Sequence, residues 1–286
     1  MRRLDTCADL LAAHHQAGRH LCIGLDSEVM RLPASLLPSG SPAERVVAFN
    51  REIIDRTAEI TCAYKPNAAF YEALGAPGFR ALADTISAVR QRAPSVAVIL
   101  DAKRADIGST NRGYASAAFD QLGADALTVH PYLGREALGP FLERTEKLVF
   151  VLARTSNPGA GEFQDLMVDG LPLYRRVARA VATEWNAAGN CGLVVGATYP
   201  RELADVRADV PTSVPILVPG VGAQGGELAS VVEIHARSQS SAFLVNASRS
   251  ILFASDDEDF AEAAGAEAQR LHDAIRTQLA TTPVSS

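Results

Sequence analysis

Lysine is scarce in this chain of 286 residues. Lysine and arginine together number 27, but lysine occurs only at positions 65, 103 and 147. An arginine guanidinium keeps its proton in proteins, whereas a lysine ammonium can donate one, so the few lysines are the first candidates for chemistry. Lys103 stands out because two carboxylates flank it, Asp101 and Asp106, directly after an apolar run. Charges at the end of a buried strand indicate a reactive site.

Cysteine is scarce too, and its four copies lie far apart, at 7, 22, 62 and 191. This spacing contains no Cys-x-x-Cys pair and favours buried free thiols in a reducing compartment. No run of about 18 apolar residues is present, so no membrane span is expected. Asp5 and Asp9 interrupt any apolar N-terminal segment, which argues against a signal peptide. We therefore expect a cytoplasmic protein.

Basic clusters and metal motifs are missing as well. The net charge is −6, and no run of basic residues is present. Nucleic acid and anionic membranes are therefore not expected as partners, although a local basic pocket could still bind an anionic small molecule. His14, His15 and His20 lack the spacing of metal ligands, and the chain shows neither a zinc motif nor a serine–histidine–aspartate elbow.

What the chain does have is an alternation of short apolar runs with longer amphipathic segments. Each run is continuously apolar, as expected for parallel strands that are buried on both faces. The eight expected strands span residues 21–26, 62–66, 97–101, 126–130, 148–153, 192–196, 215–219 and 242–246. The helices expected between and after them span residues 42–60, 78–92, 109–122, 134–145, 172–188, 200–208, 226–236 and 257–279.

Eight strand–helix units predict a closed (β/α)₈ TIM barrel, an α/β fold. An open, doubly wound sheet is the alternative. We expect a single domain over residues 1–286, because no linker divides the chain. It would carry an N-terminal helical extension at 1–20, with a helix near 5–17, and a flexible tail at 280–286.

Polar groups follow many of the expected strands, at the end where barrel enzymes place their active sites. These polar residues are Asp26, Lys65, Asp101, Lys103, His130, Arg154, Ser156 and Arg249, and the seventh strand ends in Pro219. This rim therefore holds two of the three lysines, Lys65 and Lys103. With Asp106, which follows Lys103 by three residues, it also holds three carboxylates. We interpret the rim as a catalytic site, with a purely stabilising ion-pair network as the alternative. His130 has no evident acid–base partner, so we interpret it as a packed or capping residue.

A glycine-rich segment follows the seventh expected strand, at 219–226. Free backbone N–H groups near a helix N-terminus bind phosphate well, and Arg249 can donate two hydrogen bonds to phosphate oxygens. The loops after the seventh and eighth strands often hold phosphate in barrel enzymes. We therefore predict a phosphate site there and expect this segment to be a closing loop.

The pattern Asp-x-Lys-x-x-Asp-Ile-x-x-Thr, here at 101–110, resembles the signature of orotidine 5′-phosphate decarboxylases. The segments 153–160 and 219–226 are similar to the longer bacterial subfamily, and the resemblance spans nearly the whole chain. It implies decarboxylation of orotidine 5′-phosphate to uridine 5′-monophosphate and CO₂ in pyrimidine biosynthesis. It also implies a homodimer with shared active sites and a reaction that needs no cofactor or metal.

The resemblance implies a role for each residue of the motif. Lys103 would stabilise negative charge at C6 of the pyrimidine and then protonate that carbon. Asp101 and Asp106 would keep the ammonium charged and aimed, and Lys65 would orient Asp101. The residues expected to bind substrate, or to reach into the partner's site, are Asp26 and Lys65 at the ribose, Ser156 and Pro219 at the pyrimidine, Gln224 and Arg249 at the phosphate, and Asp106, Ile107 and Thr110 across the interface.

Two other functions remain as alternatives. A metal-dependent sugar-phosphate decarboxylase or synthase on the same barrel would need carboxylates around a magnesium ion, which Lys65 at the second strand disfavours. A non-catalytic nucleotide-binding barrel would bind without turnover, and the intact Lys103 with its two carboxylates argues against it.

Overall fold

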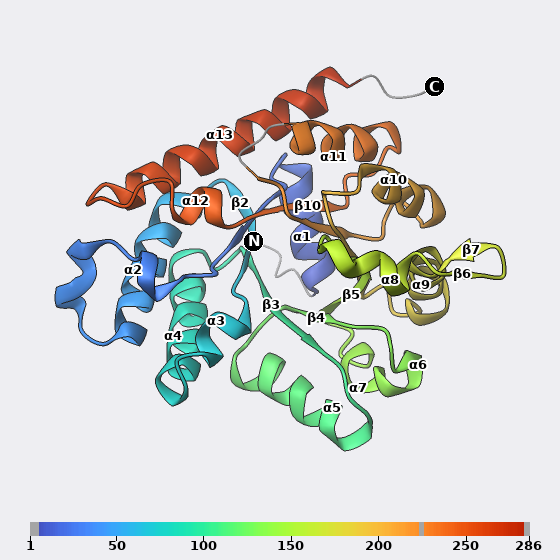
Figure 1. The fold of residues 1–286 in the computed structure, drawn as a ribbon, viewed down its shortest axis with the longest axis horizontal. Helices are drawn as coiled ribbons and strands as arrows, with labels where there is room; N and C mark the ends of the chain where they lie inside the picture. The colour runs from blue at the N-terminus through green and yellow to red at the C-terminus, as the bar shows by residue number, and fades with distance from the viewer. Residues whose placement is uncertain (1–5, 223–225, 283–286) are drawn as a thin grey trace.

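The computed structural model describes residues 6–222 and 226–282. Eight parallel strands close into a barrel, in the order β1-β10-β9-β8-β5-β4-β3-β2, and helices surround it (Figure 1). The strands are β1 (Leu21–Gly24), β2 (Thr61–Lys65), β3 (Ala97–Arg104), β4 (Ala126–Val129), β5 (Leu148–Arg154), β8 (Cys191–Val195), β9 (Ile216–Pro219) and β10 (Phe243–Ala247). The predicted barrel is thus confirmed, and the open sheet is wrong.

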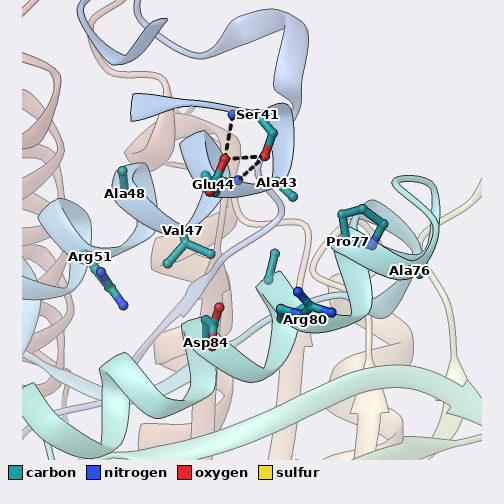
Figure 2. A pocket seen from close by; sticks show the side chains of 11 residues that line it. Ser41, Ala43, Glu44, Val47, Ala48, Arg51, Ala76, Pro77, Arg80 and Asp84 are labelled. Carbon is teal, nitrogen blue, oxygen red and sulfur yellow. Dashed lines mark hydrogen bonds between the residues drawn. The ribbon is translucent and has the colours of Figure 1, made fainter. Parts of the chain in front are cut away.

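Eight helices of at least eight residues lie outside the barrel or beneath it. They are α1 (Cys7–Gln16), α2 (Pro42–Thr57), α4 (Ala76–Arg92), α5 (Gly108–Ala115), α9 (Leu173–Ala180), α10 (Pro200–Asp209), α11 (Gly226–Arg237) and α13 (Phe260–Thr281), counted within the described ranges. Ser41 caps α2: its hydroxyl accepts from the Glu44 amide, and the Glu44 carboxylate accepts from the Ser41 amide (Figure 2).

Shorter helical turns fill the connections, and most of them were not predicted. They are η1 (Val29–Arg31), η2 (Ala34–Ser39), α3 (Ala68–Glu72), η3 (Ser116–Gln121), α6 (Gly134–Ala137), α7 (Gly139–Leu142), η4 (Pro158–Ala160), α8 (Gly161–Gln164), η5 (Val181–Trp185) and α12 (Arg249–Leu252). The helix predicted at 134–145 is broken into α6 and α7, where Gly139 and Pro140 begin the second turn. The helices predicted at 109–122 and 172–188 end in the π-helical turns η3 and η5.

The connection after β5 carries an antiparallel hairpin that sequence reasoning missed. Its strands are β6 (Met167–Val168) and β7 (Leu171–Pro172), and it lies at the outer edge of the molecule (Figure 1). Asp169 and Gly170 form the turn, both with positive φ, as tight hairpins require. Two-residue strands leave too short an alternation of polar and apolar residues to be recognised in a sequence.

The barrel interior is filled by side chains that alternate with those facing the helices. The interior cluster contains Cys22, Phe150, Leu217 and Leu244 among others, and it continues to Leu11 of α1. α1 lies at the amino ends of the strands, since Cys7 donates its amide hydrogen to Glu146 before β5 and His14 bonds the Ser95 carbonyl before β3. α1 therefore closes the bottom of the barrel.

The C-terminal helix extends further than predicted. α13 ends at Thr281, so residues 280 and 281 are helical rather than part of a flexible tail, and residues 283–286 lie outside the described part of the chain. Within the described residues, no helix is both long and apolar enough to cross a membrane.

Candidate active site

A cavity of about 530 Å³ opens at the carboxyl ends of the strands. Residues from β1, β2, β3, β9 and β10, and from the loops that follow them, meet there. The lining residues are Asp26, Lys65, Phe70, Asp101, Pro219, Gly220, Val221, Gly222, Asn246, Ser248, Arg249 and Ser250. Five of the predicted site residues thus line one cavity: the two carboxylates Asp26 and Asp101 with Lys65, Pro219 and Arg249.

Four charged side chains of alternating sign form a chain along this rim. Lys65 Nζ lies 2.9 Å from Asp101 Oδ2 and 3.9 Å from Asp26 Oδ1. Lys103 Nζ lies 2.7 Å from the other oxygen of Asp101, Oδ1. The Lys65 side chain is 4% exposed and that of Lys103 is 48% exposed. The first ammonium is therefore fixed within the protein. The second is half exposed, and Lys103 itself is not among the residues that line the cavity.

Burial and ion pairing act in opposite directions on the pKa values of these charged side chains. Burial alone would lower the pKa of Lys65, but Asp26 and Asp101 outweigh it and hold the pKa above its ordinary value. Burial alone would raise the pKa of Asp101, but Lys65 and Lys103 hold the pKa of that carboxyl well below its usual range. Asp101 and Lys65 are therefore an ionised pair at neutral pH.

A bulge in β3 aims Lys103. The pairing of β3 with β4 shifts register between Leu100 and Arg104, and Lys103 has φ of 47°, a left-handed conformation that a lysine rarely adopts. In an extended strand, Asp101 and Lys103 would share a face because they are two residues apart. Their side chains do meet, but through this bulge rather than through regular alternation.

Thr128 on β4 holds the bulge in place, and sequence reasoning missed it. Its hydroxyl donates to Asp101 Oδ1 at 2.9 Å and accepts from the amides of Ala102 and Lys103, each at 3.0 Å. The side chain is 1% exposed. One buried hydroxyl thus fixes both the carboxylate and the backbone that carries the ammonium.

Asp106, Ile107 and Thr110 lie beyond the bulge, at the start of α5, and do not line the cavity of their own chain. In the described part of the chain, Asp106 makes no ion pair with Lys103; its Oδ1 accepts from the Ile107 amide at 2.7 Å. The Ile107 side chain is 62% exposed, and Thr110 is exposed as well. This short segment is therefore not part of the wall of the local cavity.

Ser156 lies beside the cavity, in the loop after β5. It packs so tightly on Gly196, the residue after β8, that a Cβ added there would be 2.8 Å from the Ser156 Cβ. A Cβ on Gly220, which lines the cavity, would lie 3.9 Å from Ser156 Oγ. Gln164 supports this loop from behind, since its Oε1 accepts from the Thr155 amide at 2.9 Å.

The loops after β9 and β10 form another part of the cavity wall. Gly220, Val221 and Gly222 line it together with the exposed Arg249, the first residue of the short helix α12. A short extra helix beside these two loops is the usual phosphate site of barrel enzymes. Gln224, the other residue predicted to bind phosphate, lies outside the described residues.

Asn246 and Ser248 are further lining residues that sequence reasoning missed. Asn246 is 5% exposed, and it follows the interior residue Leu244 by two positions. The alternation of strand residues would have placed Asn246 inside the barrel mouth. His130 lies after β4 and is half-buried; its amide donates to the Arg104 carbonyl at 3.2 Å.

A second hollow, of about 620 Å³, lies on the outside between α2 and α4 (Figure 2). Its rim carries Glu44, Arg51, Arg80 and Asp84, which are exposed, and its floor is formed by small apolar side chains. The rim charges are solvated, so this groove lacks the buried ion pairs of the barrel mouth. In residues 6–222 and 226–282, no group of three or more histidine, cysteine or carboxylate side chains is placed to hold a metal ion.

Comparison with known proteins agrees with the motif and with the arrangement of the site. A family model described as orotidine 5′-phosphate decarboxylase / HUMPS family matches residues 19–264. The orotidine 5′-phosphate decarboxylase of Herpetosiphon aurantiacus is 51% identical over 250 residues, which cover 87% of this chain and 90% of that protein. That of Thermomicrobium roseum is 52% identical over 258 residues, covering 89% of each.

Solved structures agree with the sequence matches. The structure of Leishmania donovani OMP decarboxylase matches with a TM-score of 0.79 at 38% identity, covering 94% of this chain and 99% of that one. Its likeness extends over the barrel whose mouth holds the alternating charges of Asp26, Lys65, Asp101 and Lys103. By motif, by site geometry and by these matches, the chain belongs to the orotidine 5′-phosphate decarboxylase / HUMPS family.

Proposed function

We propose that this chain converts orotidine 5′-phosphate to uridine 5′-monophosphate and CO₂, with Lys103 as the central catalytic group. The observation that carries the proposal is the half-exposed ammonium of Lys103, 2.7 Å from Asp101, which itself lines the cavity. The names of the relatives support the substrate, since proteins about half identical over most of this chain are orotidine 5′-phosphate decarboxylases.

The chemical difficulty of this reaction is the electron pair that CO₂ leaves on C6 of the ring. This pair lies in the ring plane, where the π system does not delocalise it, so the site must stabilise a localised negative charge. A preorganised cation does this best where water is excluded. Lys103 would supply that charge and then transfer a proton from Nζ to C6, with the C6–CO₂ bond broken and the new C6–H bond formed.

The neighbours of Lys103 keep it suited to this role. Asp101 is held ionised by Lys65 on its far side, so its own charge favours the protonated form of Lys103. Thr128 fixes the Asp101 carboxylate. Lysine in place of arginine at 103 is essential to the proposal, because an arginine would stabilise the charge but not donate its proton.

The rest of the cavity fits a nucleoside monophosphate. Arg249 and the backbone of Gly220 to Gly222 would bind the phosphate on one wall. Asp26 and Lys65 would bind the ribose hydroxyls, because Asp26 Oδ1 is buried without a hydrogen-bond donor in the described chain. Ser156 would donate to the pyrimidine from the loop after β5, with Pro219 beside the ring.

We further propose that two copies of the chain share their active sites. Asp106, Ile107 and Thr110 do not line the cavity of their own chain, and the apolar Ile107 is mostly exposed. In a dimer this segment would enter the partner's site and place a second carboxylate beside Lys103. The exposed Tyr132 and Leu133, in the loop after β4, would extend the same contact.

No metal or organic cofactor is needed in this mechanism. A metal-dependent reaction of a related sugar phosphate would require acidic ligands at the strand ends, but β2 ends in Lys65, whose ammonium repels a cation. We also propose a cytoplasmic location, which is supported by four cysteines that are all buried and free.

The test is turnover of orotidine 5′-phosphate, followed by pyrimidine absorbance in the presence of a chelator. Lys103→Ala should remove essentially all activity, while the nucleotide product still binds because Arg249 and the ribose contacts remain. Activity near the wild-type level in Lys103→Ala would overturn the catalytic role. Loss of wild-type activity with the chelator, restored by magnesium, would favour the sugar-phosphate alternative instead.

A further inference from the structure

Asn111 is a fully buried amide in the first turns of α5, and none of its hydrogen-bonding capacity points to solvent. Its side chain is 0% exposed. Oδ1 accepts from the amide of Asp106 at 2.9 Å, and Nδ2 donates to the carbonyl of Asp106 at 2.5 Å. Nδ2 also donates to the carbonyl of Ala137 in α6 at 2.6 Å.

This geometry fixes one residue rather than the helix as a whole. The carboxamide of Asn111 binds both the N–H and the C=O of Asp106, as a neighbouring strand would. The third bond anchors the same amide to α6, which belongs to the next strand–helix unit. Without Asn111, the backbone of Asp106 would lose both of these hydrogen bonds, in a segment where the next residues, Ile107 and Gly108, are exposed.

The Asp106 carboxylate is the group that needs this precision. It lies outside its own cavity, and under the proposed function it acts beside Lys103 of the other chain. A misplacement of about 1 Å can cost about 100-fold in rate. A carboxylate carried on a short exposed loop needs a rigid attachment to its own barrel, and Asn111 provides one.

We infer that Asn111 is a positioning residue that acts across the dimer interface: it holds Asp106 in the place from which that carboxylate serves the partner's Lys103. The inference rests on the proposed function, because it requires shared sites. Asn111 itself touches no substrate. Its removal should therefore impair the site of the partner chain and leave the Lys103 site of its own chain intact.

The experiment uses hybrid dimers. Two chains with different affinity tags are co-expressed, one carrying Lys103→Ala and the other Asn111→Ala, and the hybrid is isolated through both tags. In this hybrid one site combines an intact Lys103 with an Asp106 held by an intact Asn111. We expect each Asn111→Ala homodimer to lose about 10- to 100-fold in kcat and the hybrid to recover about half of the wild-type rate.

A second hybrid, of Lys103→Ala with Asp106→Ala, tests the shared active site separately from the role of Asn111. If this reference hybrid is active and the Asn111→Ala hybrid is not, Asn111 acts within its own chain and the inference is wrong. If both hybrids are inactive, the shared site itself fails, and the inference fails with it. Wild-type kcat in the Asn111→Ala homodimer would also overturn it.

Matched variants control for loss of a buried amide. Asn190 is 2% exposed and donates to the carbonyls of Leu142 and Arg144, far from the cavity. Asn190→Ala should lower the melting temperature comparably but leave kcat unchanged. Asn111→Asp, which keeps the acceptor oxygen and loses both donated bonds, should behave as Asn111→Ala does in the hybrid. If no Asn111 variant gives a folded hybrid, the residue is structural and the inference is rejected.

Discussion

The Asp101 carboxylate contacts two ammonium groups and one hydroxyl. The hydroxyl contact matters for the geometry of the site as much as the two ion pairs do. Lys65 and Lys103 each bind a different carboxylate oxygen. Thr128 binds the oxygen that faces Lys103 and also the two amides before the left-handed turn. A single hydroxyl thus couples the position of the carboxylate to the backbone strain at Lys103.

Thr128→Val tests this coupling. Valine has nearly the same shape but leaves the two amides without their acceptor and Asp101 Oδ1 with the Lys103 ammonium alone, at a cost of about 1.5–3 kcal/mol for the lost bond to a charged group. We expect kcat to fall about 10- to 100-fold and Thr128→Ser to restore much of it. The measurement is steady-state turnover together with thermal melting.

Thr61→Val is the control for Thr128→Val. Thr61 is equally buried, and its hydroxyl donates to the Leu21 and Ala63 carbonyls at the other end of the barrel. It should lower stability and leave kcat unchanged. Equal losses of kcat in both variants would show that the effect is on folding rather than on the Asp101 contact.

Individual site residues differ in how far the sequence predicts them. Lys103 and Asp101 were identifiable because charges after an apolar run are conspicuous, and the motif fixes their spacing. Thr128 and Asn111 were not, since a threonine in a strand and an asparagine in a helix are ordinary there. Their roles come from hydrogen bonds to other segments of the chain, which only the folded structure brings together.

At the scale of elements, the site depends on the packing of neighbouring strand ends. The loop that carries Ser156 rests on Gly196 at the end of β8, with no room for a side chain between them. The glycine is required here for close approach rather than for its dihedral angles. The position of Ser156 therefore depends on a strand that comes much later in the sequence.

Gly196→Ala should displace the Ser156 loop. The added Cβ would lie 2.8 Å from the Ser156 Cβ and 3.0 Å from its backbone nitrogen, so backbone atoms must move. Overpacking costs about 1–3 kcal/mol, which corresponds to about a 5- to 150-fold loss in kcat/KM if it falls on substrate binding. Kinetics of the purified variant, with its melting temperature, would measure this.

Gly139→Ala is the matching control, because its Cβ would meet nothing closer than the Glu143 carboxylate at 3.8 Å. It should have wild-type kinetics. Unchanged kcat/KM in Gly196→Ala would mean that Ser156 does not contact the substrate, and its assignment to the pyrimidine would have to be withdrawn.

The strands were predicted more accurately than the connections. All eight barrel strands were placed within a few residues, because burial on both faces makes continuous apolar runs. The hairpin β6–β7 and the breaks between α6 and α7 were missed, since their few residues carry no periodicity. The bulge at Lys103 was missed for another reason: nothing in the residues of β3 shows that β4 supplies a hydroxyl to hold it.

At the scale of the whole molecule, the candidate active site and a group of buried histidines lie at opposite ends of the barrel. Near the amino ends of the strands, the rings of His15, His20, Phe243 and His235 form a continuous stack with centroid separations of 4.2–4.7 Å. Burial lowers the pKa of His20 to about 4 and that of His235 to about 3, and it lowers the pKa of His15 well below its ordinary value. We call these four rings the histidine stack.

The protein should lose stability as the pH falls below about 6.5. There the unfolded chain binds protons at its histidines while the folded histidine stack stays neutral, so the free energy of unfolding decreases with decreasing pH. Each histidine contributes up to about 1.4 kcal/mol per pH unit, down to a pH near 4 for His20. Urea unfolding at pH 7, 6 and 5 measures the slope.

His15→Phe identifies the source of this slope. The Nε2 of His15 is buried without a hydrogen-bond partner in the described chain, so phenylalanine can keep the ring contact with His20 and lose no bond of that nitrogen. The slope of the unfolding free energy between pH 6.5 and 5 should decrease by up to about 1.4 kcal/mol per pH unit. Slopes that coincide for the variant and the wild type would assign the acid sensitivity elsewhere.

The position of α1 across the bottom of the barrel has a consequence for how carbon dioxide leaves the site. The interior cluster packs between α1 and the charged rim, so the open side of the cavity is the direct way out for a small gas. Under the proposed function, carbon dioxide would leave by the same opening that admitted the nucleotide. Whatever covers that opening during the reaction therefore also controls how long the gas stays beside the new C6–H bond.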